Sequence, residues 1–205
     1  MSLSQKPAPR LILASASPRR RELLRLLGVE FEVCPSEIEE KQGPGEPVEV
    51  YVARLAREKA EMSREREGAV PDHRDTLILG CDTEVALDGV PLGKPAVGPN
   101  ADADAARMLR LLAGRAHEVL TAICLLSSDP ARCRQHVEYT RVWFSEMSDA
   151  EIAEYVATGE PRDKAGAYAI QGHAARFIPR IEGCYYNVMG LPVAALYSLL
   201  RQELA

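Results

Sequence analysis

The sequence lacks any hydrophobic run of the length that a membrane span needs, and it lacks an apolar segment near its start. These two absences predict a protein that is not exported, has no membrane partner and is located in the cytoplasm. Positive charge is not in excess either, because 25 Lys and Arg stand beside 30 Asp and Glu, for a formal net charge of −5. This balance argues against general binding to nucleic acid, so any anion site must be a local cluster of basic residues.

Cysteine and histidine are too scattered to predict a disulfide framework or a zinc site. The five cysteines include no Cys-x-x-Cys pair, and the four histidines have no spacing typical of metal ligands. Most of the cysteines lie in apolar, strand-like runs, a pattern that is typical of reduced thiols. With 205 residues, of which 46% are hydrophobic, the chain is long enough to bury one sizeable core without such staples.

The order of predicted helices and strands indicates a mixed α/β fold with one domain over residues 10–205, preceded by a disordered tail over residues 1–9. Apolar periodicity and capping residues predict helices at 18–27, 47–65, 102–112, 149–158 and 192–204. Strands are predicted at 11–14, 31–35, 76–81, 84–87, 90–92, 118–126, 135–144, 167–170 and 176–181. Asp88-Gly89 is a strong hairpin signal, and Ser148 with Glu151 has the spacing of a capping box.

At the start of the first predicted helix, two hydroxyls, a proline and clustered cations follow an apolar run. Ser17 is a suitable N-cap residue, and Pro18 suits the first helical position. Free backbone N–H groups at a helix N-terminus, with Arg19 and Arg20 beside them, favour an anion such as a polyphosphate. Cations at that end oppose the helix dipole, so their presence calls for an explanation. A capped helix with a solvated basic first turn is the alternative.

Three further predicted loops carry side chains that suit a metal and a polyphosphate. The candidates from all four loops are Ser15, Ser17, Arg19, Arg20, Glu40, Asp82, Lys94, Asp163, Lys164 and Gln171. Sites in α/β folds gather where strands end, and there carboxylates can hold a divalent cation while lysine and arginine neutralise phosphate oxygens. The pattern contains no Ser-His-Asp or Cys-His arrangement, which favours water as the nucleophile.

Each candidate also has a structural interpretation that the pattern alone does not exclude. Asp82, at the predicted end of a strand, could cap the following turn. Glu40 could be a solvated residue of an acidic loop. Lys94, and Lys59 on the second predicted helix, could be ordinary exposed lysines.

Taken together, several motifs resemble the Maf family. They run in family order from about residue 11 to residue 200, which makes the set far more specific than any one motif. The motifs are Ser15-x-Ser17-Pro18-Arg19-Arg20-x-Glu-Leu-Leu, Arg54-Leu-Ala-x-x-Lys59-Ala, Asp82-Thr83, Leu92-Gly93-Lys94-Pro95, Gly159-Glu-Pro-x-Asp163-Lys164-Ala-Gly166-Ala-Tyr-x-Ile-Gln171-Gly172 and Ile181-Glu-Gly-Cys-Tyr-Tyr-Asn-Val-Met-Gly-Leu-Pro192.

The resemblance implies an acid-anhydride hydrolase, a nucleoside triphosphate pyrophosphatase that depends on a divalent cation, Mg²⁺ or Mn²⁺. Such an enzyme would release the nucleoside monophosphate and pyrophosphate, and would remove surplus or non-standard pyrimidine nucleotides. The implied fold is an elongated mixed sheet flanked by helices with a central cleft, related to the inosine-triphosphatase group. A homodimer is expected.

The resemblance also implies roles for individual residues. Asp82 corresponds to the proton acceptor, and Asp82 with Glu40 corresponds to the metal site. The residues implied to bind phosphate are Ser15, Ser17, Arg20, Lys59, Lys94 and Lys164. Arg19, Thr83 and Gln171 occupy the positions that separate subgroups, and this set resembles the enzymes that act on dTTP and UTP. The 7-methyl-GTP subgroup has an aromatic residue, Gln and Glu there, whereas an amide such as that of Gln171 suits a neutral uracil or thymine edge.

Two residues depart from the family pattern. Glu84 stands where the family usually has an aliphatic residue. Its side chain could join the metal site or point away from Asp82, and we favour the second, because neighbours on a strand face opposite sides. Cys184 replaces a residue that is usually serine, and this change should be tolerated.

Two other functions stay open at this stage. One is the same chemistry on other modified nucleotides, which a substrate panel would reveal. The other is a nucleotide-binding regulator of septum formation and cell division in which hydrolysis is secondary. A regulator would keep its role in cells that carry Asp82→Asn, whereas an enzyme would lose it.

Overall fold

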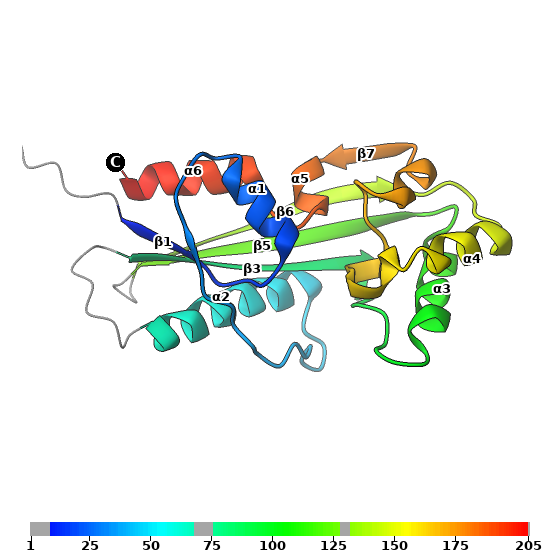
Figure 1. The fold of residues 1–205 in the computed structure, drawn as a ribbon, viewed down its shortest axis with the longest axis horizontal. Helices are drawn as coiled ribbons and strands as arrows, with labels where there is room; N and C mark the ends of the chain where they lie inside the picture. Colours follow the sequence, from blue (N-terminus) through cyan, green and yellow to red (C-terminus); the bar gives the residue numbers. More distant parts are fainter. Residues whose placement is uncertain (1–8, 68–75, 128–131, 205) are drawn as a thin grey trace, which may run out of the picture.

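The protein is built on one mixed sheet whose three longest strands run along most of the molecule (Figure 1). The computed structural model describes residues 9–67, 76–127 and 132–204. Its strands are β1 (Arg10–Leu13), β2 (Glu32–Val33), β3 (Thr76–Leu87), β4 (Val90–Pro91), β5 (Ala116–Ser127), β6 (Cys133–Trp143) and β7 (Arg180–Gly183). They lie in the order β2-β1-β3-β5-β6-β7, with β4 paired to β3. Strand β1 pairs in parallel with β2 and β3 and the other pairs are antiparallel, which confirms the predicted mixed α/β class.

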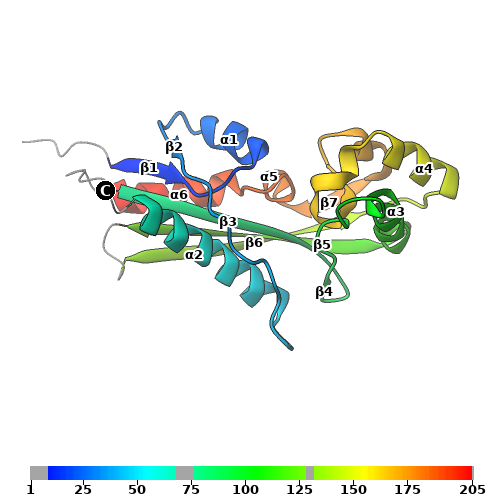
Figure 2. The ribbon, with the colours of Figure 1, turned by 60° about the horizontal axis from the view of Figure 1, so that its bottom comes forward.

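Helices cover both faces of the sheet at one end of the molecule and gather at the other end (Figures 1 and 2). The α-helices are α1 (Pro18–Arg25), α2 (Val48–Glu67), α3 (Ala101–Leu112), α4 (Asp149–Ala157), α5 (Tyr185–Val188) and α6 (Val193–Leu204). Three short 3₁₀ segments are η1 (Glu160–Asp163), η2 (Ala165–Ala167) and η3 (His173–Phe177). Helix α2 lies along one face of the long strands, and α1 and α6 lie on the opposite face. Helices α3 and α4 lie at the far end, near β7.

Alternation along β3 sends its apolar side chains to the two faces of the sheet. Ile78 packs under α2, while Leu77 and Leu79 pack with α1 and α6. Gly80 allows α2 to approach closely, because a Cβ at this position would lie 1.9 Å from the carbonyl oxygen of Ala56. A larger residue at position 80 would therefore push α2 away from the sheet.

Most of the predicted helices and strands are confirmed within a few residues. The predicted capping residues are confirmed too: Ser17 caps α1, and Ser148 with Glu151 forms the capping box of α4. Asp88 and Gly89 form the tight turn between β3 and β4, with positive φ values of 51° and 78°. Local sequence signals were therefore sufficient at these helix ends and at this hairpin.

The predicted end of the third strand was wrong. β3 does not stop at Cys81 but continues without a break to Leu87, so Asp82 and Thr83 lie in the middle of a strand. Antiparallel pairing with β5 holds this part of β3 in place, with Asp82 opposite Ala122. The polar residues in this run suggested a loop, but they lie on the strand where it borders an open cleft.

Two other strand predictions were wrong. Residues 167–170 do not form a strand, because Gly166 and Ala167 adopt positive φ values of 66° and 62° and turn the chain. The strand predicted at 176–181 begins only at Arg180, after η3.

The remaining predictions concern the N-terminal tail, the cysteines and the absence of a membrane span. Residues 1–8 of the predicted tail lie outside the described residues. All five cysteines fall within the described ranges, and all are free thiols. No helix in the described ranges has both the length and the apolar character to span a membrane.

Candidate active site

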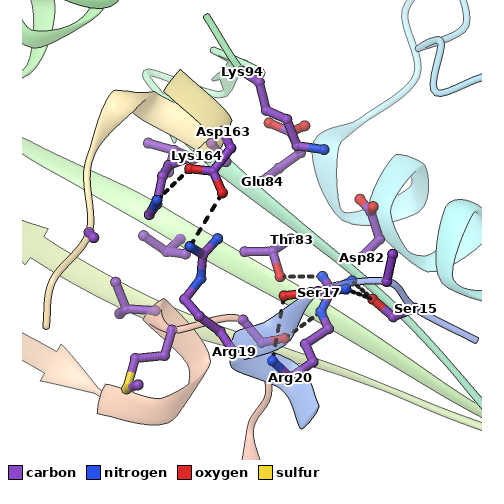
Figure 3. Close-up of a pocket in the computed structure, with 18 of the residues that line it drawn as sticks. Ser15, Ser17, Arg19, Arg20, Asp82, Thr83, Glu84, Lys94, Asp163 and Lys164 are labelled. Carbon is purple, nitrogen blue, oxygen red and sulfur yellow. Dashed lines mark hydrogen bonds and ion pairs between the residues drawn. The ribbon is translucent and has the colours of Figure 1, made fainter. Parts of the chain in front are cut away.

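A cleft of about 510 Å³ opens where the loop after β1, the middle of β3, helix α2 and the loop after β4 meet the segment from η1 to η2 (Figure 3). It is lined by every residue to which a catalytic, metal, phosphate or specificity role was assigned from the sequence. Those residues are Ser15, Ser17, Arg19, Arg20, Glu40, Lys59, Asp82, Thr83, Lys94, Lys164 and Gln171. The structure thus brings together residues that are up to 156 positions apart in the chain (171 − 15). Their individual roles stay predictions.

Lys59 connects the two predicted metal-binding carboxylates. Its Nζ lies 2.6 Å from Asp82 Oδ1 and 2.6 Å from Glu40 Oε1, and the lysine is only 7% exposed. Lys94 approaches from the rim, with Nζ 3.6 Å from Glu40 Oε2. Burial acts to raise the pKa of the Glu40 carboxyl, but Lys59, Lys94 and Arg20 together hold that pKa below its usual value. Glu40 is therefore ionised at neutral pH.

One oxygen of Asp82 is left without a protein partner. Its Oδ2 atom is buried and accepts no hydrogen bond from the described part of the chain, while Oδ1 is bound by Lys59. A buried polar atom without a partner costs free energy, and such atoms concentrate where a ligand or water completes the site. Oδ2 is thus an acceptor that is available to a water molecule or a cation.

The carboxylates fit a magnesium-type cation that binds together with phosphate. Within the described ranges, no group of three or more His, Cys, Asp or Glu side chains is arranged to hold a metal. Magnesium is usually held by one or two protein carboxylates plus substrate phosphates and water. Asp82 and Glu40, on either side of the Lys59 ammonium, supply such a pair.

The prediction that Glu84 points away from Asp82 was wrong. Residues two apart on a strand share a face, so Glu84 lies on the same face of β3 as Asp82 and also lines the cleft. Thr83 lies on the other face, where Arg20 binds its hydroxyl. The Glu84 carboxylate accepts a hydrogen bond from the backbone N–H of Gly93 at 3.2 Å. Burial, and then the negative charge of Asp82, raise the pKa of Glu84 to about 7.

Arg20, predicted to bind phosphate, is held by the protein itself. Its guanidinium donates to the carbonyl oxygens of Gly190 and Cys81, each at 2.9 Å, to Thr83 Oγ1 at 3.0 Å and to Ser15 Oγ at 3.2 Å. Arg20 therefore fixes the loop after β1 against β3 and the turn at Gly190. Its charge still faces the cleft, since it contributes to the low pKa of Glu40.

Across the cleft, Arg19 and Lys164 surround Asp163 (Figure 3). Arg19 NH1 lies 3.8 Å from Asp163 Oδ2, and Lys164 pairs with Asp163 while also donating to the carbonyl oxygen of Glu160 at 3.0 Å. Gln171 is exposed and lines the same cavity. Both cations are thus paired with Asp163, whereas the Gln171 amide is exposed to the cleft.

The family described as "Maf-like protein" matches residues 10–203. This chain belongs to that family. A protein of Anaeromyxobacter dehalogenans named "dTTP/UTP pyrophosphatase" is 50% identical over 197 residues, covering 95% of this chain and 94% of the relative. A protein of Aquifex aeolicus with the same name is 45% identical and covers 94% of this chain and 95% of the relative.

Among solved structures, the Ham1 protein of Staphylococcus aureus aligns with this Maf-like chain at a TM-score of 0.45 and 17% identity. That alignment covers 95% of this chain and 99% of the other.

Two tyrosines of this Maf-like protein line the cleft and were missed in the sequence. Tyr51 lies on α2 eight residues before Lys59, so helical spacing could have placed both on one face. Burial, followed by the charges of Glu84, Asp82 and Glu40, raises the pKa of Tyr51 to about 12. Tyr168 is held by a buried contact of 2.8 Å between its hydroxyl and His117 Nε2. No local pattern indicated that contact, because the two residues are 51 positions apart.

Proposed function

We propose that this Maf-like protein is a nucleoside triphosphate pyrophosphatase that hydrolyses dTTP and UTP to the monophosphate and pyrophosphate. The observation that carries the proposal is the free, buried Oδ2 of Asp82 beside Lys59, in a cleft that also holds Arg19, Lys94 and Lys164. A base surrounded by cations suits water attack on a polyanionic substrate. The names of relatives at 45–50% identity over most of the chain support the same reaction.

In the proposed reaction, Asp82 acts as the general base. Oδ2 takes a proton from a water molecule whose oxygen forms a bond to the α-phosphorus. The bond between that phosphorus and the oxygen bridging to the β-phosphate breaks, and pyrophosphate leaves with the bonding electrons. Lys59, 2.6 Å from Oδ1, holds the carboxylate in place, and Lys94 at the rim is placed to neutralise the leaving phosphates.

A divalent cation, Mg²⁺ or Mn²⁺, would be held by Asp82 and Glu40 and would supply further neutralisation of the phosphate oxygens. The second oxygen of Asp82, which has no partner in the described part of the chain, and the ionised state of Glu40 support this assignment.

Selection of the base is proposed to rest mainly on Gln171. Its exposed amide is free to donate to and accept from a uracil or thymine edge. Thr83 is different, because its hydroxyl is bound by Arg20 and lies 3.0 Å from Thr121 Oγ1. Thr83 therefore contributes to the shape of the cleft floor, and Arg19 contributes charge at the wall.

The deciding experiment is pyrophosphate release by the purified protein with Mg²⁺ or Mn²⁺. The panel comprises dTTP, UTP, CTP, the purine triphosphates and 7-methyl-GTP. Turnover of dTTP and UTP to monophosphate and pyrophosphate is expected. Preference for another nucleotide would contradict the specificity proposal alone, and binding without turnover would favour the nucleotide-binding regulator.

Asp82→Asn is the matched inactive variant. Because the amide cannot accept the proton, kcat should fall by roughly 10²- to 10⁴-fold, the usual contribution of a general base. The variant should remain folded, because Lys59 keeps its ion pair with Glu40 and can still donate to the amide oxygen at position 82. Wild-type turnover by a folded Asp82→Asn protein would contradict the role of Asp82.

A further inference from the structure

Glu84 is a carboxylate of the cleft to which neither the family pattern nor the proposed reaction gives a role. Its Oε2 accepts the N–H of Gly93 at 3.2 Å, and Gly93 immediately precedes Lys94. The preceding residue is also fixed to β3, since the N–H of Leu92 donates to the carbonyl oxygen of Val85 at 2.9 Å. Two consecutive hydrogen bonds therefore hold the loop after β4 to successive residues of one rigid strand.

Gly93 also connects this loop to the opposite wall of the cleft. Its carbonyl oxygen accepts the N–H of Gly166 at 2.8 Å. Gly166 packs directly on β3, because a Cβ there would lie 2.8 Å from a methyl carbon of Val85. The segment that carries Asp163 and Lys164 is thus tied, through the carbonyl group of Gly93, to the loop that carries Lys94.

Lys94 itself has little side-chain packing to hold it. Its side chain is 57% exposed, and its ion pair with Glu40 spans 3.6 Å. Exposed ion pairs of this kind contribute little to the position of a long side chain. The direction in which Lys94 leaves the backbone must therefore come from its loop. Glu84 holds that loop before the lysine, at the Gly93 N–H, and Asp104 holds it after the lysine, where its Oδ2 accepts the N–H of Ala96 at 2.9 Å.

We propose that Glu84 is a positioning residue for Lys94: by accepting the N–H of Gly93, it aims the lysine at the triphosphate. The proposal rests on the proposed function in so far as the ligand is a nucleoside triphosphate. Glu84 acts through Lys94 and does not contact the reacting atoms.

The test is a double-mutant cycle between Glu84→Ala and Lys94→Ala. Glu84→Ala should raise KM for dTTP by roughly 3- to 10-fold with kcat nearly unchanged, as expected for the loss of one hydrogen bond that orients a binding group. In the Lys94→Ala background, the same change should alter KM less than about 2-fold, because its effect passes through the lysine. Glu84→Gln, whose amide oxygen can still accept the Gly93 N–H, should restore most of the wild-type KM.

Binding of inorganic tripolyphosphate, measured by calorimetry on the same variants, gives a readout that does not depend on turnover. The same coupling between positions 84 and 94 is expected there. Glu182→Ala, which removes an exposed carboxylate on β7, serves as the control and should leave both readouts unchanged. Additive effects in the cycle, or failure of Glu84→Gln to restore KM in a variant with wild-type thermal stability, would overturn the proposal. A wild-type protein that hydrolyses no nucleotide would contradict the proposed function instead, and the calorimetric cycle would still decide the role of Glu84.

Discussion

At the scale of single residues, Lys59 has two roles: it stabilises the fold, and it holds the Asp82 carboxylate in place for the proposed reaction. It is buried, and it pairs with Asp82, whose side chain is 7% exposed, as well as with the more exposed Glu40. Replacing both members of a buried ion pair can be nearly neutral, whereas removing one member leaves an uncompensated charge in a poorly solvated place. The loss of stability on replacing Lys59 should therefore come mainly from the Asp82 carboxylate, which is left buried without its partner.

Lys59→Met should lower the free energy of unfolding by roughly 3–5 kcal/mol, and Lys59→Met with Asp82→Asn should recover a large part of this loss. Urea denaturation at pH 7 measures both. Arg57→Met is the matched control on the same helix, since Arg57 forms an exposed pair with Glu61 and its replacement should cost no more than about 0.5 kcal/mol. Equal losses for Lys59→Met and Arg57→Met would show that the buried pair does not carry this stability.

Gln171 is the residue whose chemistry is proposed to select the base. Gln171→Glu exchanges a group that donates and accepts for one that only accepts when ionised, and should lower kcat/KM for UTP by roughly 10-fold or more. Competition between UTP and CTP measures the change in preference. The exposed Gln202→Glu on α6 makes the same exchange away from the cleft and should have no effect. An unchanged UTP preference in Gln171→Glu would contradict this role.

At the scale of elements, sequence patterns located most helices and strands and also the motifs that line the cleft. They failed where long-range contacts decide the backbone. Asp82 and Thr83 were predicted to follow the end of a strand because they interrupt an apolar run. Pairing with β5 continues on both sides of them, so β3 includes both residues. Glu84 was misplaced for a different reason: it was treated as a neighbour of Asp82, although residues two apart on a strand share a face.

The segment after Gly166 shows the other limit of local patterns. Ala167 adopts a φ of 62°, which non-glycine residues rarely do, and the turn persists because Tyr168 is anchored to His117 on β5. His117 packs edge-on against Phe144 and Tyr168, with ring centroids 5.1 and 5.3 Å away. Such a contact between distant segments leaves no periodic trace in the sequence.

The pH dependence of the free energy of unfolding tests whether His117 is buried in this contact with Tyr168. Burial lowers the pKa of His117 from 6.5 to about 4, so the unfolded chain binds a proton in this pH range that the folded protein does not. Stability should therefore fall as the pH falls from about 6.5 to about 4, by roughly 2–3 kcal/mol from this residue. The difference in unfolding free energy between wild type and His117→Gln, followed by urea denaturation across this range, should change by that amount.

The exposed His173 provides the control for this measurement. His173→Gln is the same substitution at the surface and is measured over the same pH range. If His117→Gln follows the wild-type pH dependence, the buried histidine does not bind its proton only on unfolding, and the assigned environment is wrong.

At the scale of the whole molecule, the cleft lies on long strands, β3 and β5, that contribute to the hydrophobic cores at both ends of the sheet. Along β3, Leu77 and Leu79 belong to the core under α1 and α6, whereas Val85 and Leu87 belong to the core with α3 and α4. β5 pairs with β3 from Ala86 to Leu77 without interruption, directly beneath the cleft. Neither core can lose its strands without exposing the other, so residues 10–205 are expected to unfold as one domain.

Trp143, the sole tryptophan of the chain, reports on the far end of this arrangement, where its ring lies under Arg180 near β7. Far-ultraviolet circular dichroism reports on all elements. In urea, the two signals should give one coincident transition with the same midpoint and slope, because the long strands couple both cores. A Trp143 transition at a separate urea concentration would instead show that the end with α3 and α4 is an independent unit. The cleft would then be an interface between two units that can separate, and bound tripolyphosphate would shift the two transitions by different amounts instead of moving a single one.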